Sequence, residues 1–280
     1  MQLSDEYIFD ALSGIYSREE IRVFIRYMLE DVCNVSFSGV SACKFNNLSD
    51  AQAQKIKDIV ERLRRREPIQ YILGKTEFYG LPFIVAPGVL IPRPETEELV
   101  EWIVAENAME NPKILDIGCG SGCISVTLAK KIPGAEVHAW DVSPTALELT
   151  RKNAALNNTK VHTSQTDVLK LNGCGTVFDV IVSNPPYVLE TEKAEMEKNV
   201  LDFEPHIALF VPDTNPLLFY DKITDLALTN LSAKGKLYFE VNREKGHDVK
   251  EMLQKKGFTN AELRKDISGN NRMVRAEKPM

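Results

Sequence analysis

The sequence lacks several features that would place it in a specialised class of protein. No apolar run approaches the roughly 20 residues that a membrane-spanning helix needs. The first six residues include two acidic residues and no basic one, and no apolar stretch follows, so the start of the chain does not read as a secretory signal. No repeat and no low-complexity tract is present. We therefore expect a cytoplasmic protein that does not contact membranes.

Cysteine is also scarce, and basic residues are not in excess. The five cysteines form no regular framework. Although Cys119 and Cys123 lie close together, no second Cys or His pair completes four zinc ligands, so we expect no metal. The formal net charge of −6 weighs against a protein that grips long nucleic acid, because phosphate neutralisation needs a basic face. The basic run 62–66 fits the solvated end of a helix, with partner docking as the alternative.

The 280 residues are enough for a small accessory domain and a catalytic domain. Residues 1–75 carry apolar side chains at three- and four-residue intervals, which is typical of helices, and Ser49 is a plausible helix cap. We expect a small helical bundle there. Aromatic and β-branched residues then flank Gly80, which predicts a β-hairpin linker over residues 76–92. The catalytic domain is expected to occupy residues 93–280.

From residue 113 the chain alternates between strand and helix patterns. This alternation implies an α/β domain with a mainly parallel sheet, right-handed crossovers and helices on both faces. The last two strands are expected to form an antiparallel hairpin. The predicted strands are 113–117, 136–141, 160–163, 178–183, 236–241, 261–267 and 272–277, and the predicted helices include 144–156 and 216–231.

A glycine-rich turn follows the first of these strands. Gly118-Cys119-Gly120-Ser121-Gly122, called the glycine loop below, leads from a buried strand into a helix. Its glycines allow a sharp turn and a close approach to a ligand. The third glycine comes one residue too early for the dinucleotide fingerprint, and no Walker lysine follows. The helix N-terminus suits the carboxylate of an amino-acid-like cofactor.

Two acidic residues follow later strands. Asp141 ends the second strand 19 positions after Gly122 (141 minus 122), where a carboxylate can accept both ribose hydroxyls of an adenosine. Asp167 follows the third strand and is placed to accept from the adenine amino group, with Val168 against the ring. Each acid alone is equally compatible with a turn. Together with the glycine loop they indicate an adenosine-containing cofactor at the carboxyl edge of the sheet.

The fourth strand delivers Asn184-Pro185-Pro186-Tyr187, called the acceptor motif below. The prolines remove two backbone donors, so carbonyl oxygens are free to point into the cleft, and the asparagine adds a side-chain acceptor. These acceptors can receive both hydrogens of one planar NH2 group. They orient it and disperse the positive charge that develops on its nitrogen, so no strong base is required. Tyr187 offers a face for stacking on the planar group. An ordinary turn is the alternative, and the preceding glycine loop and acids disfavour it.

These residues carry a resemblance over nearly the whole length: the chain resembles the HemK/PrmC family, the peptide chain release factor N5-glutamine methyltransferases. The run Ile91-Pro92-Arg93-Pro94-Glu95-Thr96-Glu97 is the most family-specific feature, whereas DNA adenine methyltransferases share the acceptor motif. The other matching segments are residues 68–74, 83–85, 89–90, the glycine loop and residues 266–272.

The resemblance implies a seven-stranded, Rossmann-like methyltransferase domain, an N-terminal helical domain that recognises the substrate, and the hairpin linker. The implied cofactor is S-adenosyl-L-methionine, with S-adenosyl-L-homocysteine as product. Its implied contacts are Gly118, Cys119, Gly120, Ser121, Gly122, Asp141, Val168 and Asn184, and the strand-end argument adds Asp167. The implied substrate is the glutamine of the Gly-Gly-Gln loop of class I release factors, and the implied holding residues are Asn184, Pro185, Pro186 and Tyr187, with Asn184, Pro185 and Tyr187 as catalytic residues.

Two rival functions use the same residues differently. A nucleic-acid amino-methyltransferase, acting on adenine N6 or guanine N2, would share the acceptor motif but would have to extract a base and hold the phosphate backbone. The acidic balance opposes it, and we expect no direct nucleic-acid binding. A non-catalytic cofactor-binding scaffold has no use for Asn184. Nothing marks a dimer seam, so a monomer is the default expectation.

The chain departs from the family pattern in two places. Residues 211–217 replace a Gly-x-Asp-Gly-Leu stretch, and Glu240-Val241-Asn242 stands where the family has Glu-Ile-Gly. We expect neither segment to touch the glycine loop or the acceptor motif.

Overall fold

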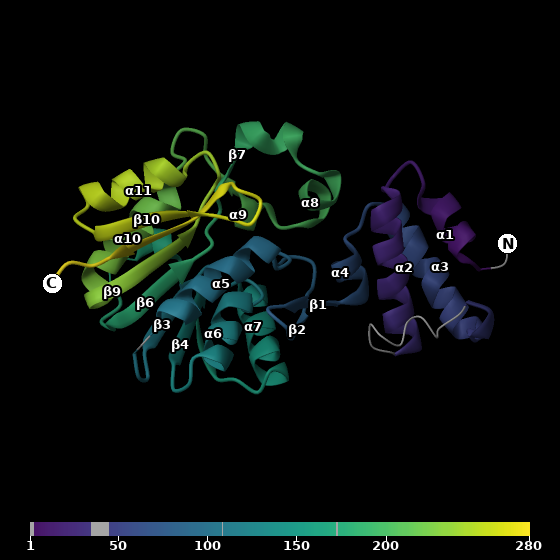
Figure 1. Ribbon diagram of the computed structural model, residues 1–280, viewed down its shortest axis with the longest axis horizontal. Helices are drawn as coiled ribbons and strands as arrows, with labels where there is room; N and C mark the ends of the chain where they lie inside the picture. The colour runs from purple at the N-terminus through teal and green to yellow at the C-terminus, as the bar shows by residue number, and fades with distance from the viewer. Residues whose placement is uncertain (1–2, 35–44, 108, 172) are drawn as a thin grey trace. The chain divides into compact units, whose positions relative to one another are not determined.

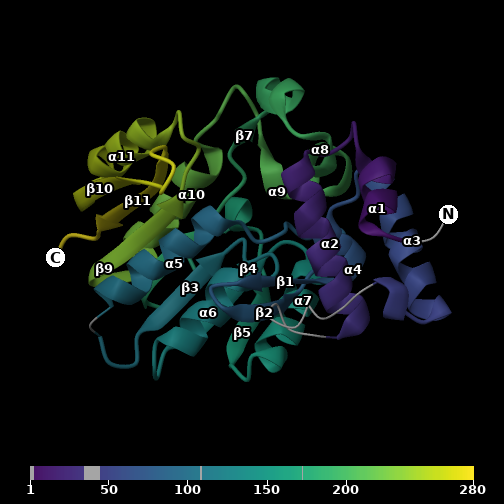
Figure 2. The same ribbon diagram turned by 45° about the vertical axis from the view of Figure 1, so that its right-hand side comes forward.

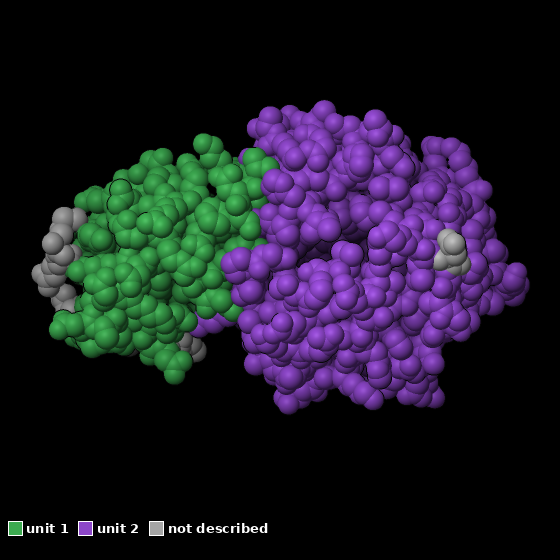
Figure 3. Space-filling view, turned by 180° about the vertical axis from the view of Figure 1, so that it is seen from behind, with its two compact units in different colours: residues 1–74, 197–203 green, residues 75–196, 204–280 purple. Residues whose placement is uncertain are grey.

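The computed structural model describes residues 3–34, 45–107, 109–171 and 173–280. The chain divides into two compact units, shown in green and purple in Figure 3. Unit 1 comprises residues 1–74 and also residues 197–203, which lie within the range predicted for the catalytic domain. Unit 2 comprises residues 75–196 and 204–280. In the described part of the chain, no helix is long and apolar enough to cross a membrane.

Unit 1 is helical, as its sequence periodicity predicts. Its main helices are α1 (Asp5–Leu12), α2 (Arg18–Cys33), α3 (Asp50–Arg64) and α4 (Ile69–Leu73), and α8 (Lys198–Phe203) belongs to the same unit. Ser49 caps α3 in a capping box with Gln52, which confirms the predicted cap. At the end of α3, Arg62 Nε donates to Glu67 Oε2 at 2.7 Å. Arg64 of the same basic run pairs with Glu61 at 3.1 Å, so two members of the run are paired within the unit.

Unit 2 is built on a seven-stranded sheet in the order β10-β11-β9-β6-β3-β4-β5. The five strands from β9 to β5 are parallel to one another, while β11 runs antiparallel to both of its neighbours. The predicted mainly parallel sheet with a terminal antiparallel hairpin is thus confirmed. The strands are β3 (Lys113–Ile117), β4 (Glu136–Asp141), β5 (Val161–Gln165), β6 (Phe178–Ser183), β9 (Leu231–Glu240), β10 (Thr259–Lys265) and β11 (Asn271–Glu277).

Helices cover both faces of this sheet (Figures 1 and 2). One face packs against α5 (Pro94–Glu106), α6 (Cys123–Lys131) and α7 (Pro144–Leu156), and the other against α10 (Leu218–Asn230) and α11 (Gly246–Lys255). Successive residues of a strand point to opposite faces. In β9, for example, Leu237 and Phe239 join the α10 side, whereas Tyr238 joins the α5 side.

Glu106, the last residue of α5, ties this helix to the sheet. Its carboxylate accepts from Trp102 Nε1 at 2.7 Å, from the Tyr238 hydroxyl at 2.8 Å and from Arg275 Nη1 at 2.8 Å. Burial raises the pKa of Glu106, but these hydrogen bonds and that from Lys236 outweigh it and lower the pKa to about 2. The helix is therefore held to β9 and β11 at the end remote from its first turn.

The predicted hairpin is present as β1 (Lys75–Phe78) paired antiparallel with β2 (Leu81–Ile84). It belongs to unit 2. The buried Asn153 side chain of α7 accepts from the Ile84 amide at 2.7 Å and donates to the carbonyls of Ile84 and Ser121, both at 2.9 Å. One amide side chain thus joins the hairpin to the glycine loop.

Several short elements lie between β6 and α10. They are β7 (Val188–Leu189), the 3₁₀ turn η4 (Glu190–Glu195), α9 (His206–Leu209) and β8 (Phe210–Val211). β7 and β8 pair in parallel. Because β3, β4, β5 and β6 are parallel, the segments that follow them meet at one edge of the sheet. This edge carries the residues that the sequence singles out.

Candidate active site

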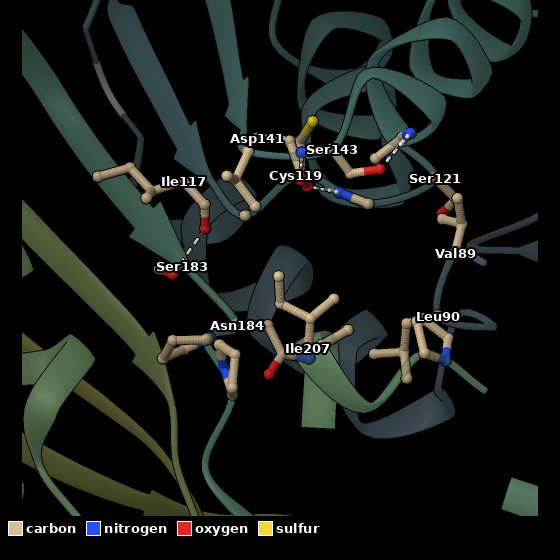
Figure 4. Close-up of a pocket in the computed structure, with 18 of the residues that line it drawn as sticks. Val89, Leu90, Ile117, Cys119, Ser121, Asp141, Ser143, Ser183, Asn184 and Ile207 are labelled. Carbon is tan, nitrogen blue, oxygen red and sulfur yellow. Dashed lines mark hydrogen bonds between the residues drawn. The ribbon is translucent and has the colours of Figure 1, made fainter. Parts of the chain in front are cut away.

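A cavity of about 300 Å³ opens at the carboxyl edge of the sheet, entirely within unit 2. Figure 4 shows the glycine loop and Asp141 on one side of it, with Asn184, Ile207 and Leu90 on the opposite side. The structure therefore brings together the segments that the sequence marks as separate motifs. The lining includes residues 88–93, 117–121, 141–143, 166–169 and 183–186, together with Thr96, Cys123, Ile124, Ala146, Pro205, Ile207, Ala208, Phe219 and Ile223.

The glycine loop is shaped by left-handed backbone conformations. Gly118 has φ +76° and Gly122 has φ +79°, a region that glycine adopts without strain. A Cβ at Gly118 would meet no atom within 4 Å, whereas a Cβ at Gly122 would lie 2.9 Å from Thr150 Cγ2. Gly122 is therefore required for close packing against α7. Gly118, which lines the cavity, leaves space for a ligand to approach the backbone.

Two carboxylates accept hydrogen bonds from backbone amides in and next to the glycine loop. Asp116, fully buried in β3, accepts from the Ser125 amide in the first turn of α6 at 3.1 Å. Burial raises its pKa to about 7, although hydrogen bonding to Ser125 opposes the change. Asp141, at the end of β4, accepts from the Gly120 amide at 2.9 Å and from the Ser143 amide at 2.8 Å. Burial also raises the pKa of Asp141.

Asp141 can still serve as an acceptor for a ligand. Each carboxylate oxygen offers two lone pairs. One backbone donor occupies each oxygen, and the side chain lines the cavity. The two backbone bonds also fix the direction of the carboxylate. The geometry thus suits a pair of neighbouring hydroxyls.

Asp167 and Val168 both line the cavity, as the strand-end argument requires. Asp167 also has a local role, because its Oδ1 accepts from the Leu169 amide at 3.1 Å and its Oδ2 pairs with Lys170 at 2.9 Å. These contacts start the 3₁₀ turn η3 (Val168–Lys170). The turn-residue alternative is therefore realised for Asp167. Its contact with an adenine stays a prediction.

The acceptor motif enters the cavity at the end of β6. Asn184, Pro185 and Pro186 line it, while Tyr187 is not among the described lining residues. The Tyr187 hydroxyl instead donates to Glu240 Oε1 at 3.1 Å, and burial raises the pKa of this phenol. Stacking of Tyr187 on an acceptor group stays a prediction.

One expectation about the divergent segments is wrong. Residues 240–242 do touch the acceptor motif: Glu240 accepts from the Tyr187 hydroxyl, and Asn242 Nδ2 donates to the Tyr187 carbonyl at 3.3 Å. Asn242 also donates to Glu192 at 3.2 Å. The contacts arise because β9 lies next to β6 in the sheet, so the ends of the two strands are neighbours. A motif comparison along the chain does not show this.

Other lining residues were not singled out as site residues. Thr96, in the first turn of α5, lines the cavity and hydrogen-bonds both Asn184 and Glu240. Arg93 lines the cavity and pairs with the buried Glu204 at 2.5 Å, and Glu204 also accepts from the Ile91 amide at 3.1 Å. Ile91, Arg93 and Thr96 belong to the family-specific run 91–97, and the composition of that run alone assigns them no role.

The cavity fits a ligand with a polar and a flat apolar part. Asp141 provides the anionic acceptor, Gly118 leaves open backbone, and Val142, Val168 and Ile207 provide apolar surface. Ile207 is 65% exposed and Val142 is 43% exposed, so both leave apolar surface that a ligand in the cavity can cover. These are the features that an adenosine attached to an amino acid would need.

Comparisons with known proteins agree with this arrangement. A family model for the PrmC N-terminal domain matches residues 7–74, and a model for the methyltransferase small domain matches residues 95–202. The release factor glutamine methyltransferase of Flavobacterium psychrophilum is 48% identical over 269 residues, covering 95% of this chain and 94% of that protein. The protein of the same description from Bacteroides thetaiotaomicron is 46% identical, covering 97% of this chain and 98% of that protein.

Solved structures share the fold of unit 2. A methyltransferase from Pyrococcus furiosus superposes with a TM-score of 0.52 at 20% identity, covering 72% of this chain and 91% of that one. At this identity the likeness bears on the fold alone. The match of residues 95–202 to the methyltransferase small domain agrees with this fold.

Proposed function

The chain belongs to the family of release factor glutamine methyltransferases, and from this premise we propose that it methylates the side-chain amide nitrogen (N5) of the glutamine in the Gly-Gly-Gln motif of class I release factors. S-adenosyl-L-methionine is the proposed methyl donor and S-adenosyl-L-homocysteine the product. The single observation that supports this best is the placement of Asn184, Pro185 and Pro186 in the same cavity as the glycine loop and Asp141.

The donor half of the cavity is assigned to the glycine loop, Asp141 and the strand-end residues. Asp141 holds the ribose hydroxyls, because its carboxylate is fixed by two backbone donors and keeps free lone pairs. Val168 and Ile207 cover the adenine, and Asp167 accepts from its amino group. When bound, the cofactor supplies an electrophilic methyl group attached to a positively charged sulfur.

The acceptor half is assigned to residues 184–187. A glutamine amide nitrogen is a poor nucleophile, since its lone pair is delocalised into the carbonyl. The Asn184 side-chain oxygen and a neighbouring backbone carbonyl accept both of its hydrogens, which fixes the orientation of the nitrogen and offsets the charge that develops on it. Pro185 and Pro186 lack an N–H, so they offer no competing donor. After transfer the methylated nitrogen carries a positive charge and loses one of its hydrogens as a proton to solvent water, so the site needs no strong base.

Transfer assays with labelled cofactor test this proposal. The purified protein should label a release factor, and Gln→Ala in the Gly-Gly-Gln loop of that factor should abolish the label. Mass spectrometry of the labelled peptide should place one methyl group on the glutamine side chain. Labelling of DNA or ribosomal RNA, with none on the release factor, contradicts the proposal and supports the nucleic-acid alternative.

Substitution of Asn184 separates the two halves of the cavity. We expect Asn184→Ala to reduce kcat by about 100-fold or more, in line with the loss of one oriented group at a developing charge. The cofactor dissociation constant should change less. An equal loss of kcat and of cofactor affinity would show that Asn184 acts chiefly on the cofactor.

A further inference from the structure

A chain of hydrogen bonds lies behind the acceptor motif, and it involves two residues that the proposed chemistry does not use. Asn184 Nδ2 donates to Thr96 Oγ1 at 3.3 Å, and the Thr96 hydroxyl donates to Glu240 Oε2 at 2.6 Å. The other oxygen of Glu240 accepts from the Tyr187 hydroxyl at 3.1 Å. One carboxylate therefore connects to both ends of the acceptor motif.

This chain has a defined direction. A hydroxyl carries a single proton. The Thr96 hydroxyl uses this proton in its short hydrogen bond to the Glu240 carboxylate, which can only accept. Toward Asn184, Thr96 can then only accept, so the NH2 end of the Asn184 amide must face it. The carbonyl end of the amide is left for the cavity. In the opposite orientation of the amide, Asn184 Oδ1 would face Thr96 Oγ1, and both are acceptors. The Asn184 NH2 group, a donor, would then face the substrate.

Burial and two hydrogen bonds hold the Glu240 side chain in place. Its side chain is 1% exposed and Thr96 is 2% exposed, so water does not compete for these bonds. Burial raises the pKa of Glu240, but the hydroxyls of Thr96 and Tyr187 and the charge of Arg272 act against this. Arg272 is itself held by Asp266, with Nε and Oδ2 3.1 Å apart.

We infer that Thr96 and Glu240 are positioning residues that orient the Asn184 amide with its oxygen toward the substrate NH2 group. The inference rests on the proposed function, since it explains how the acceptor motif presents acceptors only. It assigns a role to the threonine of the family-specific run 91–97 and to the glutamate of the 240–242 segment. Neither residue needs to touch the substrate.

Thr96→Val tests the inference, because valine keeps the shape of threonine and removes its hydroxyl. We expect kcat for release factor methylation to fall by about 100-fold, as for a misoriented catalytic group. The cofactor dissociation constant should change by less than about threefold, because the Thr96 hydroxyl bonds Asn184 and Glu240 and not the glycine loop or Asp141. Thr96→Ser, which keeps the hydroxyl, should restore kcat to within about tenfold of the wild type.

Thr127→Val is the matched control. Thr127 in α6 is fully buried, and its hydroxyl has no hydrogen-bond partner among the described residues. Its loss should leave kcat unchanged. If Thr96→Val does not fold, Thr96→Cys replaces the hydroxyl with a thiol, a weak acceptor, at similar volume. Its kcat should likewise fall well below that of Thr96→Ser.

The outcomes separate the two proposals. A wild-type protein that does not label the release factor overturns the proposed function. A wild-type protein that labels it, with Thr96→Val as fast as Thr127→Val, overturns the inference alone. An equal loss of kcat in Thr96→Val and Thr96→Ser also overturns the inference, since the hydroxyl would then not matter. A parallel loss of cofactor affinity in Thr96→Val would place its effect on the glycine loop instead.

Discussion

Replacement of Asp141 by asparagine tests the donor half of the cavity. The carboxylate accepts from two backbone amides, those of Gly120 and Ser143, at 2.9 and 2.8 Å. Asparagine keeps one acceptor oxygen and places an NH2 group where the other stood. One backbone amide then faces a donor instead of an acceptor, and the negative charge that would attract the ribose hydroxyls is lost.

The expected size of the effect follows from these contacts. A hydrogen bond to a charged group contributes about 1.5–3 kcal/mol, and about 1.4 kcal/mol corresponds to a tenfold change in affinity. Loss of one such bond on the ligand side should therefore weaken cofactor binding by about 10- to 150-fold. Isothermal titration calorimetry with S-adenosyl-L-homocysteine measures this directly.

The pH dependence provides a second readout. Because burial raises the pKa of Asp141, its carboxylate takes up a proton at a higher pH than an ordinary aspartate does. The wild-type affinity should fall as the pH is lowered through that range, since the protonated form has one acceptor fewer. Asp141→Asn cannot titrate there, so this part of its pH profile should be flat.

Asp179→Asn is the control for stability. Asp179 accepts from the Lys113 amide at 2.9 Å and from the Ser232 hydroxyl at 3.0 Å, at the start of the strands and outside the cavity lining. The Asp179→Asn variant should lose about as much stability as Asp141→Asn, without a loss of cofactor affinity. An unchanged dissociation constant in Asp141→Asn, or equal weakening in both variants, would refute the assignment of Asp141 to the ligand.

Two further predictions concern stability, measured by urea unfolding. Gly122→Ala should cost about 2–4 kcal/mol, from left-handed strain together with overpacking against Thr150, whose Cγ2 would lie 2.9 Å from the new Cβ. Gly118→Ala meets nothing within 4 Å and should cost only the strain, about 1–2 kcal/mol, so equal costs would contradict the packing argument. Glu106→Gln should destabilise the protein by about 2 kcal/mol at pH 7, allowing for its partial exposure. Because the folded-state pKa is lowered from 4.5 to about 2, this difference is fully present above pH 4.5 and should shrink as the pH falls toward 2; a difference that grows in acid would show the opposite shift.

The parts of the fold that the sequence predicts well are those with strong local patterns. β3, β4 and β6 begin and end at the predicted residues, since each is an apolar or β-branched run bounded by turn residues. β9 begins at Leu231 instead of 236, because its first part contains Ser232, Lys234 and Gly235, which carry no strand pattern. The short elements α9, β7 and β8 were not predicted, since two to four residues are too few to show periodicity.

The residues of the candidate site likewise fall into those that the sequence predicts and those that it does not. The glycine loop, Asp141 and Asn184 stand at strand ends, and the order of the strands alone brings such residues together. The Thr96–Glu240 bond joins residues 144 positions apart, and the Asn184–Thr96 bond joins residues 88 positions apart. Local patterns carry no information about such pairs. Only the pairing of β6 with β9 and the packing of α5 on that face bring them into contact.

The position of β11 in the sheet bears on how the enzyme is made. β11 is synthesised after every other strand of the sheet, yet it lies between β9 and β10. Among the described residues β10 pairs with no strand other than β11, so it cannot join the sheet until residues 271–277 have left the ribosome. Arg272, whose positive charge lowers the pKa of the buried Glu240 against the effect of burial, arrives in the same segment. A chain that ends before residue 271 therefore lacks both the last sheet pairing and the positive charge of Arg272 that acts on Glu240.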